Sequence, residues 1–294
     1  MTKAVGQSAP QDPLDAERRE AEDALAGAFY EGFAAQRPVL RKALAEAKAE
    51  LLAAQAARAQ ERSKQGLDVT VDWAALEGLL QAQVLEMIQA IYDQAHVSAK
   101  AEVDALGLKT AWDIFDAAAR EQALAYGYDL IKQVNTSTRQ QIGKAIARWI
   151  ETPADFDALV EDIWKLVPEN PFPNMRDRAR TIAQTETTRV YAMSRLGSFN
   201  AAGLKRQRWR TAMDELVCPM CGPLGLANEG EGAVGQAGVF ADPTTGEQVG
   251  IPPRHVGCRC WIVEDVAELE DMLAQQGQEG PQPAKPKKPK KPAW

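Results

Sequence analysis

The N-terminal half of the chain is dominated by long amphipathic runs that contain few Gly and Pro residues. Between residues 14 and 62, apolar residues recur at helical spacing, and a second run of this kind begins at Trp73, after the break at Gly66. Such stripes predict helices that bury one face in a core. Pro38 is expected to interrupt the first helix, because its ring cannot continue the hydrogen-bond ladder.

Three further helices are expected before residue 168. One covers about 110–125, a second begins at a Ser137 cap and ends near 150, and a third begins at Thr152 and Pro153 and runs to 167. The segment 168–173 contains three prolines, which forbid regular hydrogen bonding. A domain boundary is therefore predicted there.

Beyond this boundary the pattern changes. A helix is expected over 175–202 and a strand over 205–211, and eight glycines among residues 222–250 predict a β-hairpin or a long loop rather than a helix. We therefore predict an α+β fold, predominantly α-helical, with a C-terminal helix and a small β/loop metal knuckle. Its expected parts are a disordered N-terminus, a helical domain, a domain carrying the knuckle, and a short helix with a disordered Lys/Pro tail: 1–13, 14–167, 168–266 and 267–294.

The sequence shows no sign of a signal peptide or of a membrane span. Residues 1–15 lack the basic and apolar regions of a signal peptide, and no stretch approaches the roughly 20 apolar residues of a membrane span. We expect a protein made in the cytosol, with no membrane partner.

Charge is distributed unevenly, although the formal net charge is only −7. Residues 176–210 contain nine basic side chains against two acidic ones, and residues 281–294 contain five lysines and no acid. Basic segments of this kind favour weak, sequence-independent contact with nucleic acid. The candidate contacts are Arg206, Arg208, Arg210, Lys287, Lys288, Lys290 and Lys291.

Glu186 falls in the middle of an apolar stripe on the helix expected over 175–202. A carboxylate in such a place is costly unless it is paired. We expect a structural ion pair, with Arg189 or Arg180 on the same helix as partner. The alternative is that Glu186 is a catalytic residue, but no second acid or histidine to work with it lies nearby in the sequence.

All four cysteines and one of the two histidines lie within 43 residues. Cys218 and Cys221 form a CxxC turn, and His255, Cys258 and Cys260 form a second short knuckle. Such a pair of knuckles is typical of a tetrahedral site, with Zn²⁺ as the expected structural ion. Five candidates compete for four places: we favour the four cysteines, with His255 either replacing one of them or packing behind them.

Three alternatives compete with a structural metal. Two disulfides are disfavoured in a reducing cytosol, and a redox CxxC belongs between a strand and a helix rather than in a Gly-rich region. A metal-dependent nuclease would need more than the one histidine to provide both a base and ligands. Four Cys/His ligands would also leave no open position for a catalytic water, so no catalytic residue is assigned.

Four segments, taken in order, carry a family resemblance: Arg180 to Glu186, Trp209 to Asp214, Val217 to Cys221 and Pro252 to Cys260. Together they resemble the head morphogenesis domain of tailed-phage minor head proteins, the group typified by protein F of phage Mu. The resemblance covers about residues 174–264. One departure is Val256, which stands where the family usually has proline after the histidine.

The resemblance implies a non-enzymatic minor head (minor capsid) protein of a bacteriophage. Such a protein is a low-copy part of the procapsid in the host cytoplasm and of the virion head. It is associated with the portal protein and with scaffold or major capsid protein, and is needed for assembly and DNA packaging. The N-terminal helices would engage these partners, and packaged DNA is a further candidate partner. The alternative function is a zinc-containing DNA-binding protein or nuclease acting on phage DNA.

Overall fold

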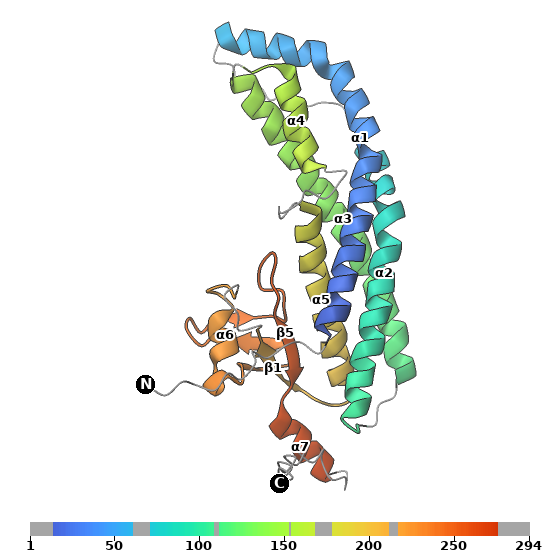
Figure 1. The fold of residues 1–294 in the computed structure, drawn as a ribbon, viewed down its shortest axis with the longest axis vertical. Coiled ribbons are helices and arrows are strands. Elements are labelled where there is room, and N and C mark those ends of the chain that lie inside the picture. Colours follow the sequence, from blue (N-terminus) through green and yellow to red (C-terminus); the bar gives the residue numbers. More distant parts are fainter. Residues whose placement is uncertain are drawn as a thin grey trace, which may run out of the picture.

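A computed structural model of the chain describes residues 14–60, 71–108, 112–152, 154–167, 178–211 and 217–275. In these ranges a bundle of long helices is followed by a small antiparallel sheet, so the predicted fold class, α+β and predominantly α, is confirmed. The helices of the bundle are α1 (Asp15–Gln60), α2 (Trp73–Ala105), α3 (Trp112–Glu151), α4 (Phe156–Leu166) and α5 (Arg178–Ala201). Figure 1 shows α1, α2, α3 and α5 packed side by side.

Helix α2 shows how the sequence pattern forms the bundle. The Asp72 side chain caps its first turn by accepting the Ala75 N–H at 3.0 Å. Buried residues then recur every three or four positions from Leu76 to Val103, which places one continuous apolar face against α1, α3 and α5.

Helix α1 does not break at Pro38, contrary to the prediction. It continues through the proline to Gln60, and Leu40, Leu44 and Leu51 on its second half are buried. Burial of these leucines in the bundle core compensates for the backbone hydrogen bond that the proline cannot make.

The predicted helix start at Ser137 is also wrong, because α3 is one continuous helix from Trp112 to Glu151. The hydroxyls of Ser137 and Thr138 donate to the Val134 carbonyl of their own helix and accept hydrogen bonds from Arg178 of α5. Burial lowers the pKa of Arg178 to about 10. Ser137 and Thr138 therefore bind Arg178 of α5 and do not cap the start of a helix.

Helix α4 begins later than predicted. Asp155, not Thr152, is its N-cap and accepts the Ala158 N–H at 2.9 Å. The Thr152 hydroxyl instead donates to the Arg148 carbonyl at the end of α3. Pro153 lies outside the described residues.

The sheet has the strand order β4-β3-β2-β1-β5, with every neighbouring pair antiparallel. The interior strand β1 (Arg206–Arg210) confirms the predicted strand, and it pairs with the edge strand β5 so that Trp209 lies opposite Ile262. The remaining elements are α6 (Gly222–Leu226), the 3-10 helix η1 (Asn228–Gly230), β2 (Val234–Gln236), β3 (Val239–Ala241), β4 (Gln248–Val249), β5 (Trp261–Glu264) and α7 (Val266–Gln275).

The Gly-rich segment contains the expected hairpin, formed by β2 and β3, but it also begins with the short helix α6, which the glycine content had argued against. Pro223 in the first turn and the buried Leu224 favour this one turn of helix. The sheet and α6 lie beside the lower part of the bundle, and β5 packs on α5 (Figure 1).

Two cores share α5. Residues from its first half, such as Ala183 and Val190, join the bundle core, and Phe199 near its end joins a second core around Trp209 and Ile262 of the sheet. The predicted boundary at 168–173, the N-terminal residues 1–13 and the tail beyond 275 lie outside the described residues, so the division into domains stays a prediction.

Candidate metal centre

The CxxC turn presents the first two thiols. The Cys218 carbonyl accepts the backbone N–H groups of Cys221 and Gly222 at 3.1 and 3.0 Å, which closes the turn immediately before α6. The Cys221 N–H also lies 3.3 Å from the Cys218 sulfur. An N–H group donating to sulfur favours the thiolate, the form that binds metals.

The second knuckle, residues 255–260, is held against the bundle by two threonines of α5. Thr185 Oγ1 accepts the Gly257 N–H at 3.0 Å, and Thr188 Oγ1 donates to the Cys258 carbonyl at 2.9 Å. Gly257 has a φ of 73°, which a residue with a Cβ rarely adopts. Thr185, which belongs to the 180–186 motif, and Thr188, one turn further along α5, therefore fix the position of the second knuckle.

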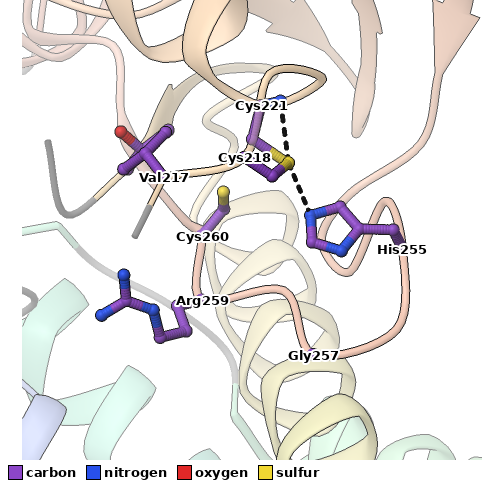
Figure 2. A pocket seen from close by; sticks show the side chains of 8 residues that line it. Val217, Cys218, Cys221, His255, Gly257, Arg259 and Cys260 are labelled. Carbon is purple, nitrogen blue, oxygen red and sulfur yellow. Dashed lines mark hydrogen bonds between the residues drawn. The ribbon is translucent and has the colours of Figure 1, made fainter. Parts of the chain in front are cut away.

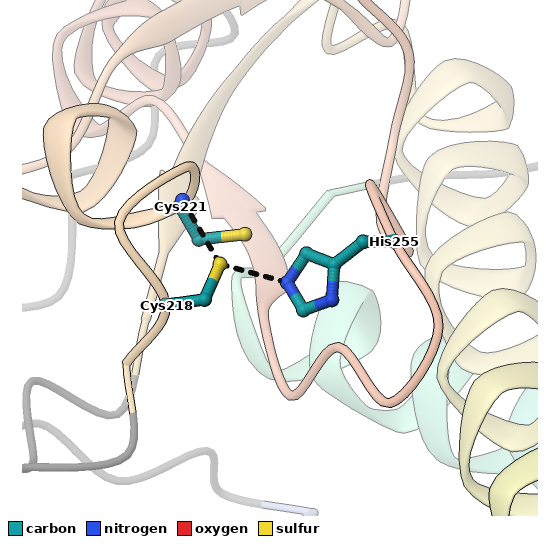
Figure 3. Close-up of side chains that lie close together, drawn as sticks. All are labelled: Cys218, Cys221 and His255. Carbon is teal, nitrogen blue, oxygen red and sulfur yellow. Dashed lines mark hydrogen bonds between the residues drawn. The ribbon is translucent and has the colours of Figure 1, made fainter.

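These two knuckles bring all five predicted metal-binding residues together. The ligand atoms of Cys218, Cys221 and His255 lie within 4.8 Å of one another, and so do those of Cys221, Cys258 and Cys260. We call these five residues the Cys/His cluster. In Figure 3 the sulfur of Cys218 lies between Cys221 and the imidazole of His255, with the His255 Nε2 atom 2.9 Å from that sulfur.

The chemistry of the cluster fits a zinc ion. Cys221 and Cys258 have their sulfurs 3.9 Å apart, and two thiolates on one tetrahedral zinc, each about 2.3 Å from the ion, stand roughly 3.8 Å apart. Hydrogen bonds from the Cys221 and Cys260 thiols lower the pKa of Cys258, and the pKa of Cys221 is raised, first of all by its hydrogen bond to Cys258. The pKa of Cys260 is raised as well. Among these three sulfurs the thiolate is therefore favoured on Cys258, and a divalent cation bound beside it would neutralise that charge.

A buried indole points to the same chemistry. Trp209 of β1 is fully buried, and its Nε1 has no oxygen or nitrogen partner in the described part of the chain. Trp209 and Cys260 pack in the same buried core, where the Cys221 thiol and, to a smaller extent, the indole act to lower the pKa of Cys260 against its overall rise. An N–H donor is well placed beside a metal-bound thiolate, where it offsets the negative charge.

The space between the knuckles is small. A cavity of about 20 Å³ separates them, and a site needs only ~10–15 Å³ of such space to hold one water-sized species. The cavity can therefore hold one ion but no organic cofactor. It is lined by Thr211, Val217, Cys218, Cys221, His255, Gly257, Arg259 and Cys260 (Figure 2).

Arg254 links the second knuckle to the CxxC turn and to the turn before β4. Its guanidinium donates to the Met220 carbonyl inside the CxxC turn at 2.5 Å and to the Asp242 carboxylate at 2.6 Å. The backbone N–H of Thr244 and the Arg254 guanidinium hold the pKa of buried Asp242 below its usual range. A single side chain thus connects the first knuckle, the second knuckle and the turn before β4.

The predicted ion pair on α5 lies away from the cluster's cavity. Arg189 Nε donates to Glu186 Oε2 at 3.0 Å, and the Glu186 side chain is 12% exposed. Burial raises the pKa of Glu186, while Arg189 opposes that rise. Arg180, the other partner considered, pairs instead with Asp23 of α1.

The arginines of β1 make internal contacts. Arg206 and Arg208 both pair at 3.0 Å with Asp265, which is fully buried just before α7, and Arg208 also pairs with Glu231 at 2.8 Å. Arg210 donates to the Gly230 carbonyl at 3.3 Å. The charges of Arg206 and Arg208, both predicted to contact nucleic acid, are therefore paired within the protein. The four predicted lysines lie outside the described residues.

Several residues that shape the cluster were missed in the sequence. Thr185 and Thr188 stand three positions apart on one helix, a spacing that places them on the same face, but nothing local shows that this face meets the second knuckle. Arg254 and Asp242 are separated by a turn and by β4, so their contact depends on the tertiary fold.

Residues 138–263 match a family model described as Phage Mu protein F like protein, which confirms the resemblance seen in the ordered motifs. The match begins inside α3 and ends in β5, and so starts earlier than the expected position near 174. Searches among curated proteins and among solved structures gave no significant match. None of the described helices combines the length and hydropathy needed to cross a bilayer.

Proposed function

We propose that this chain, whose residues 138–263 match the Phage Mu protein F like family, is a bacteriophage head morphogenesis protein that acts in procapsid assembly and DNA packaging. The family match carries the proposal. It covers about the last third of α3, all of α4 and α5, nearly all of the sheet, and every member of the Cys/His cluster. The protein would be a component of the virion head.

The helical part of the chain is proposed to dock on other head proteins. Helices α1 and α2 lie entirely outside the family match, as does the first half of α3, and a variable part attached to a shared domain is suited to recognising particular partners. The proposed partners are the portal protein and either scaffold or major capsid protein, with packaged DNA as a further contact.

The proposed role is structural rather than enzymatic. The cavity beside the cluster has room for one ion, and four Cys/His ligands would leave that ion no open position for substrate or water. Glu186, the carboxylate considered as a catalytic group, is paired with Arg189. Both observations favour assembly over the alternative of a nuclease.

A structural Zn²⁺ is proposed in the Cys/His cluster. Bound there, zinc would supply a cross-link between the two knuckles and would therefore contribute to the stability of the sheet domain. Cys218 and Cys221 would hold it from the first knuckle, and His255, Cys258 and Cys260 supply the candidates from the second.

The experiment is a stop codon early in the gene of a phage that encodes this chain, with the wild-type gene supplied from a plasmid as control. We expect the phage without the protein to yield few DNA-filled heads by electron microscopy, and the complemented phage to recover. Mass spectrometry of purified procapsids should detect the protein together with portal. Normal yields of infectious particles without it, or its absence from procapsids and virions, would contradict the proposal.

A nuclease assay distinguishes the proposed structural role from the alternative function, a nuclease. The purified protein is incubated with double-stranded DNA and Mg²⁺ or Mn²⁺, and no cleavage is expected. Cleavage that His255→Ala abolishes, and that His96→Ala leaves intact, would favour the nuclease instead.

A further inference from the structure

We propose that the Cys/His cluster is redox-sensitive: oxidation expels its zinc and joins the two knuckles by a disulfide between Cys221 and Cys258. The inference rests on the proposed zinc and on the proposed place of the protein in the virion head. It gives the cluster a second state, in which a covalent bond takes over the cross-link that the ion supplies in the first state.

The two sulfurs of the proposed bond are already in contact. Cys221 Sγ lies 3.9 Å from Cys258 Sγ, and each residue is 1% exposed. Because a disulfide bond is about 2.05 Å long, the sulfurs have to approach by about 1.9 Å once the ion is gone. The proximity that suits two thiolates on one zinc therefore also suits a bond between them.

Both cysteines are held by backbone contacts that do not involve a metal. The Cys221 carbonyl accepts the Gly225 N–H at 3.1 Å, which places Cys221 at the start of α6. The Cys258 carbonyl accepts the Thr188 hydroxyl of α5 at 2.9 Å. Cys221 and Cys258 thus come from opposite knuckles, so the bond forms across the cluster and links α6 to the segment that α5 holds.

The sulfur of Cys218 is directed elsewhere. It lies 2.9 Å from His255 Nε2 and accepts the Cys221 N–H at 3.3 Å. Figure 3 shows this sulfur between Cys221 and the imidazole. A disulfide within the CxxC turn would break the contact with His255 and leave the knuckles unjoined.

Cys218 is the cysteine that an oxidant can reach, because it is half-buried whereas the other three cysteines are buried. Its thiolate attacks a low-molecular-weight disulfide, and one small thiolate leaves. The Cys221 thiolate then displaces the second small thiolate from Cys218, and the Cys258 thiolate displaces Cys218 from Cys221. In sum, two cysteine thiolates lose two electrons and form one disulfide, and the external disulfide gains those electrons and becomes two thiolates.

The proposed place of the protein gives this chemistry an occasion. A head protein is made in the host cytoplasm, where thiols are kept reduced, and it leaves that compartment with the virion. Disulfides form and persist in the oxidising surroundings outside. The knuckles would then stay joined after the thiolates that hold zinc have been oxidised.

The test treats the full-length, zinc-containing protein with oxidised glutathione, beside a sample kept in a thiol reductant. Released zinc and remaining thiols are measured over time. Remaining thiols are then blocked and the chain is cut with trypsin, which cleaves after Arg254 and Arg259 and so separates Cys258 from Cys260. Cyanogen bromide cleaves after Met220 and separates the two cysteines of the CxxC turn.

We expect one equivalent of zinc to be released as two of the four thiols are lost. Mass spectrometry should find residues 255–259 linked to the fragment that begins at Cys221. Cys258→Ser should lose this link, and Cys218→Ser, which removes the exposed entry point, should form it more slowly. The oxidised protein should keep its protease resistance in residues 217–264 after chelation, and a thiol reductant should restore four thiols and zinc binding.

A disulfide within one knuckle, either Cys218–Cys221 or Cys258–Cys260, would overturn the inference, as would a link from Cys221 to Cys260. Retention of zinc and of all four thiols under the oxidant would overturn it as well. A wild-type protein that holds no metal beforehand but still forms the Cys221–Cys258 bond would contradict the proposed zinc and uphold the disulfide, so the two failures are distinguishable.

Discussion

The buried hydroxyl of Thr188 gives a sharp test of how α5 holds the second knuckle. Thr188 is 2% exposed, and its Oγ1 donates to the Cys258 carbonyl at 2.9 Å. Thr188→Val keeps the shape of the side chain and removes only the donor. The buried Cys258 carbonyl then loses a hydrogen bond, and water cannot easily replace it.

The expected loss is set by the cost of leaving a buried acceptor unpaired. That cost is about 1–3 kcal/mol in the free energy of unfolding. Thr187→Val is the matched control: Thr187 is fully buried on the same helix, and its hydroxyl has no hydrogen-bond partner among the described residues. Removing that hydroxyl should leave stability unchanged or raise it slightly, since no hydrogen bond is broken.

Urea unfolding followed by tryptophan fluorescence measures the free energies of both variants. Hydrogen exchange at the amides of residues 256–260 shows whether the loss is local to the knuckle. We expect faster exchange there in Thr188→Val and wild-type exchange in Thr187→Val. Equal stabilities of the two variants, or unchanged exchange in the knuckle, would refute the role assigned to Thr188.

Three other predictions concern the cluster, helix α1 and the tail. Arg254→Lys keeps the charge but loses the forked guanidinium that contacts both the Met220 carbonyl and Asp242. Zinc affinity, measured by competition with a chelator, should therefore fall by about 10–100-fold. An unchanged affinity would mean that Arg254 does not position the knuckles. Burial raises the pKa of Glu22 to about 7, against the opposing effect of Arg18, and a raised pKa stabilises the fold below the unfolded-state pKa and loses that contribution as pH rises through 7. Thermal unfolding of Glu22→Gln should therefore depend less on pH between 4.5 and 7 than that of wild type, and identical pH profiles would argue against burial of this carboxyl. Removal of residues 281–294 should weaken DNA binding in low salt and flatten the dependence of log affinity on log salt by roughly 0.9 for each phosphate that the tail no longer neutralises; unchanged binding would show that the tail does not touch the DNA backbone.

The sequence pattern was sufficient to predict the helices that bury a continuous apolar stripe and the strand β1. The pattern led to wrong predictions where a polar side chain could make more than one kind of hydrogen bond. Ser137 resembles an N-cap, but a buried Arg178 from another helix occupies its hydroxyl. Thr152 and Asp155 both suit a cap, and the choice between them depends on which carbonyl or N–H lies within reach after packing.

The membership of the cluster was predictable because cysteines and a histidine in two short knuckles have few other uses in a reduced protein. The residues that hold the cluster in place were not predictable from the sequence. The contacts that hold the second knuckle come from Thr185 and Thr188, about 70 residues earlier in the chain, and they become visible only when α5 is placed against β5.

We propose that one zinc ion holds the two knuckles together and so stabilises the segment that contains α6 and the sheet. Native mass spectrometry of the untagged full-length protein, prepared without added zinc, tests it most directly. The account predicts one Zn²⁺ per chain, lost on chelation together with protease resistance in residues 217–264, while the far-ultraviolet signal of the helical bundle persists. A metal-free protein with four titratable thiols and the same protease resistance before and after chelation would contradict it.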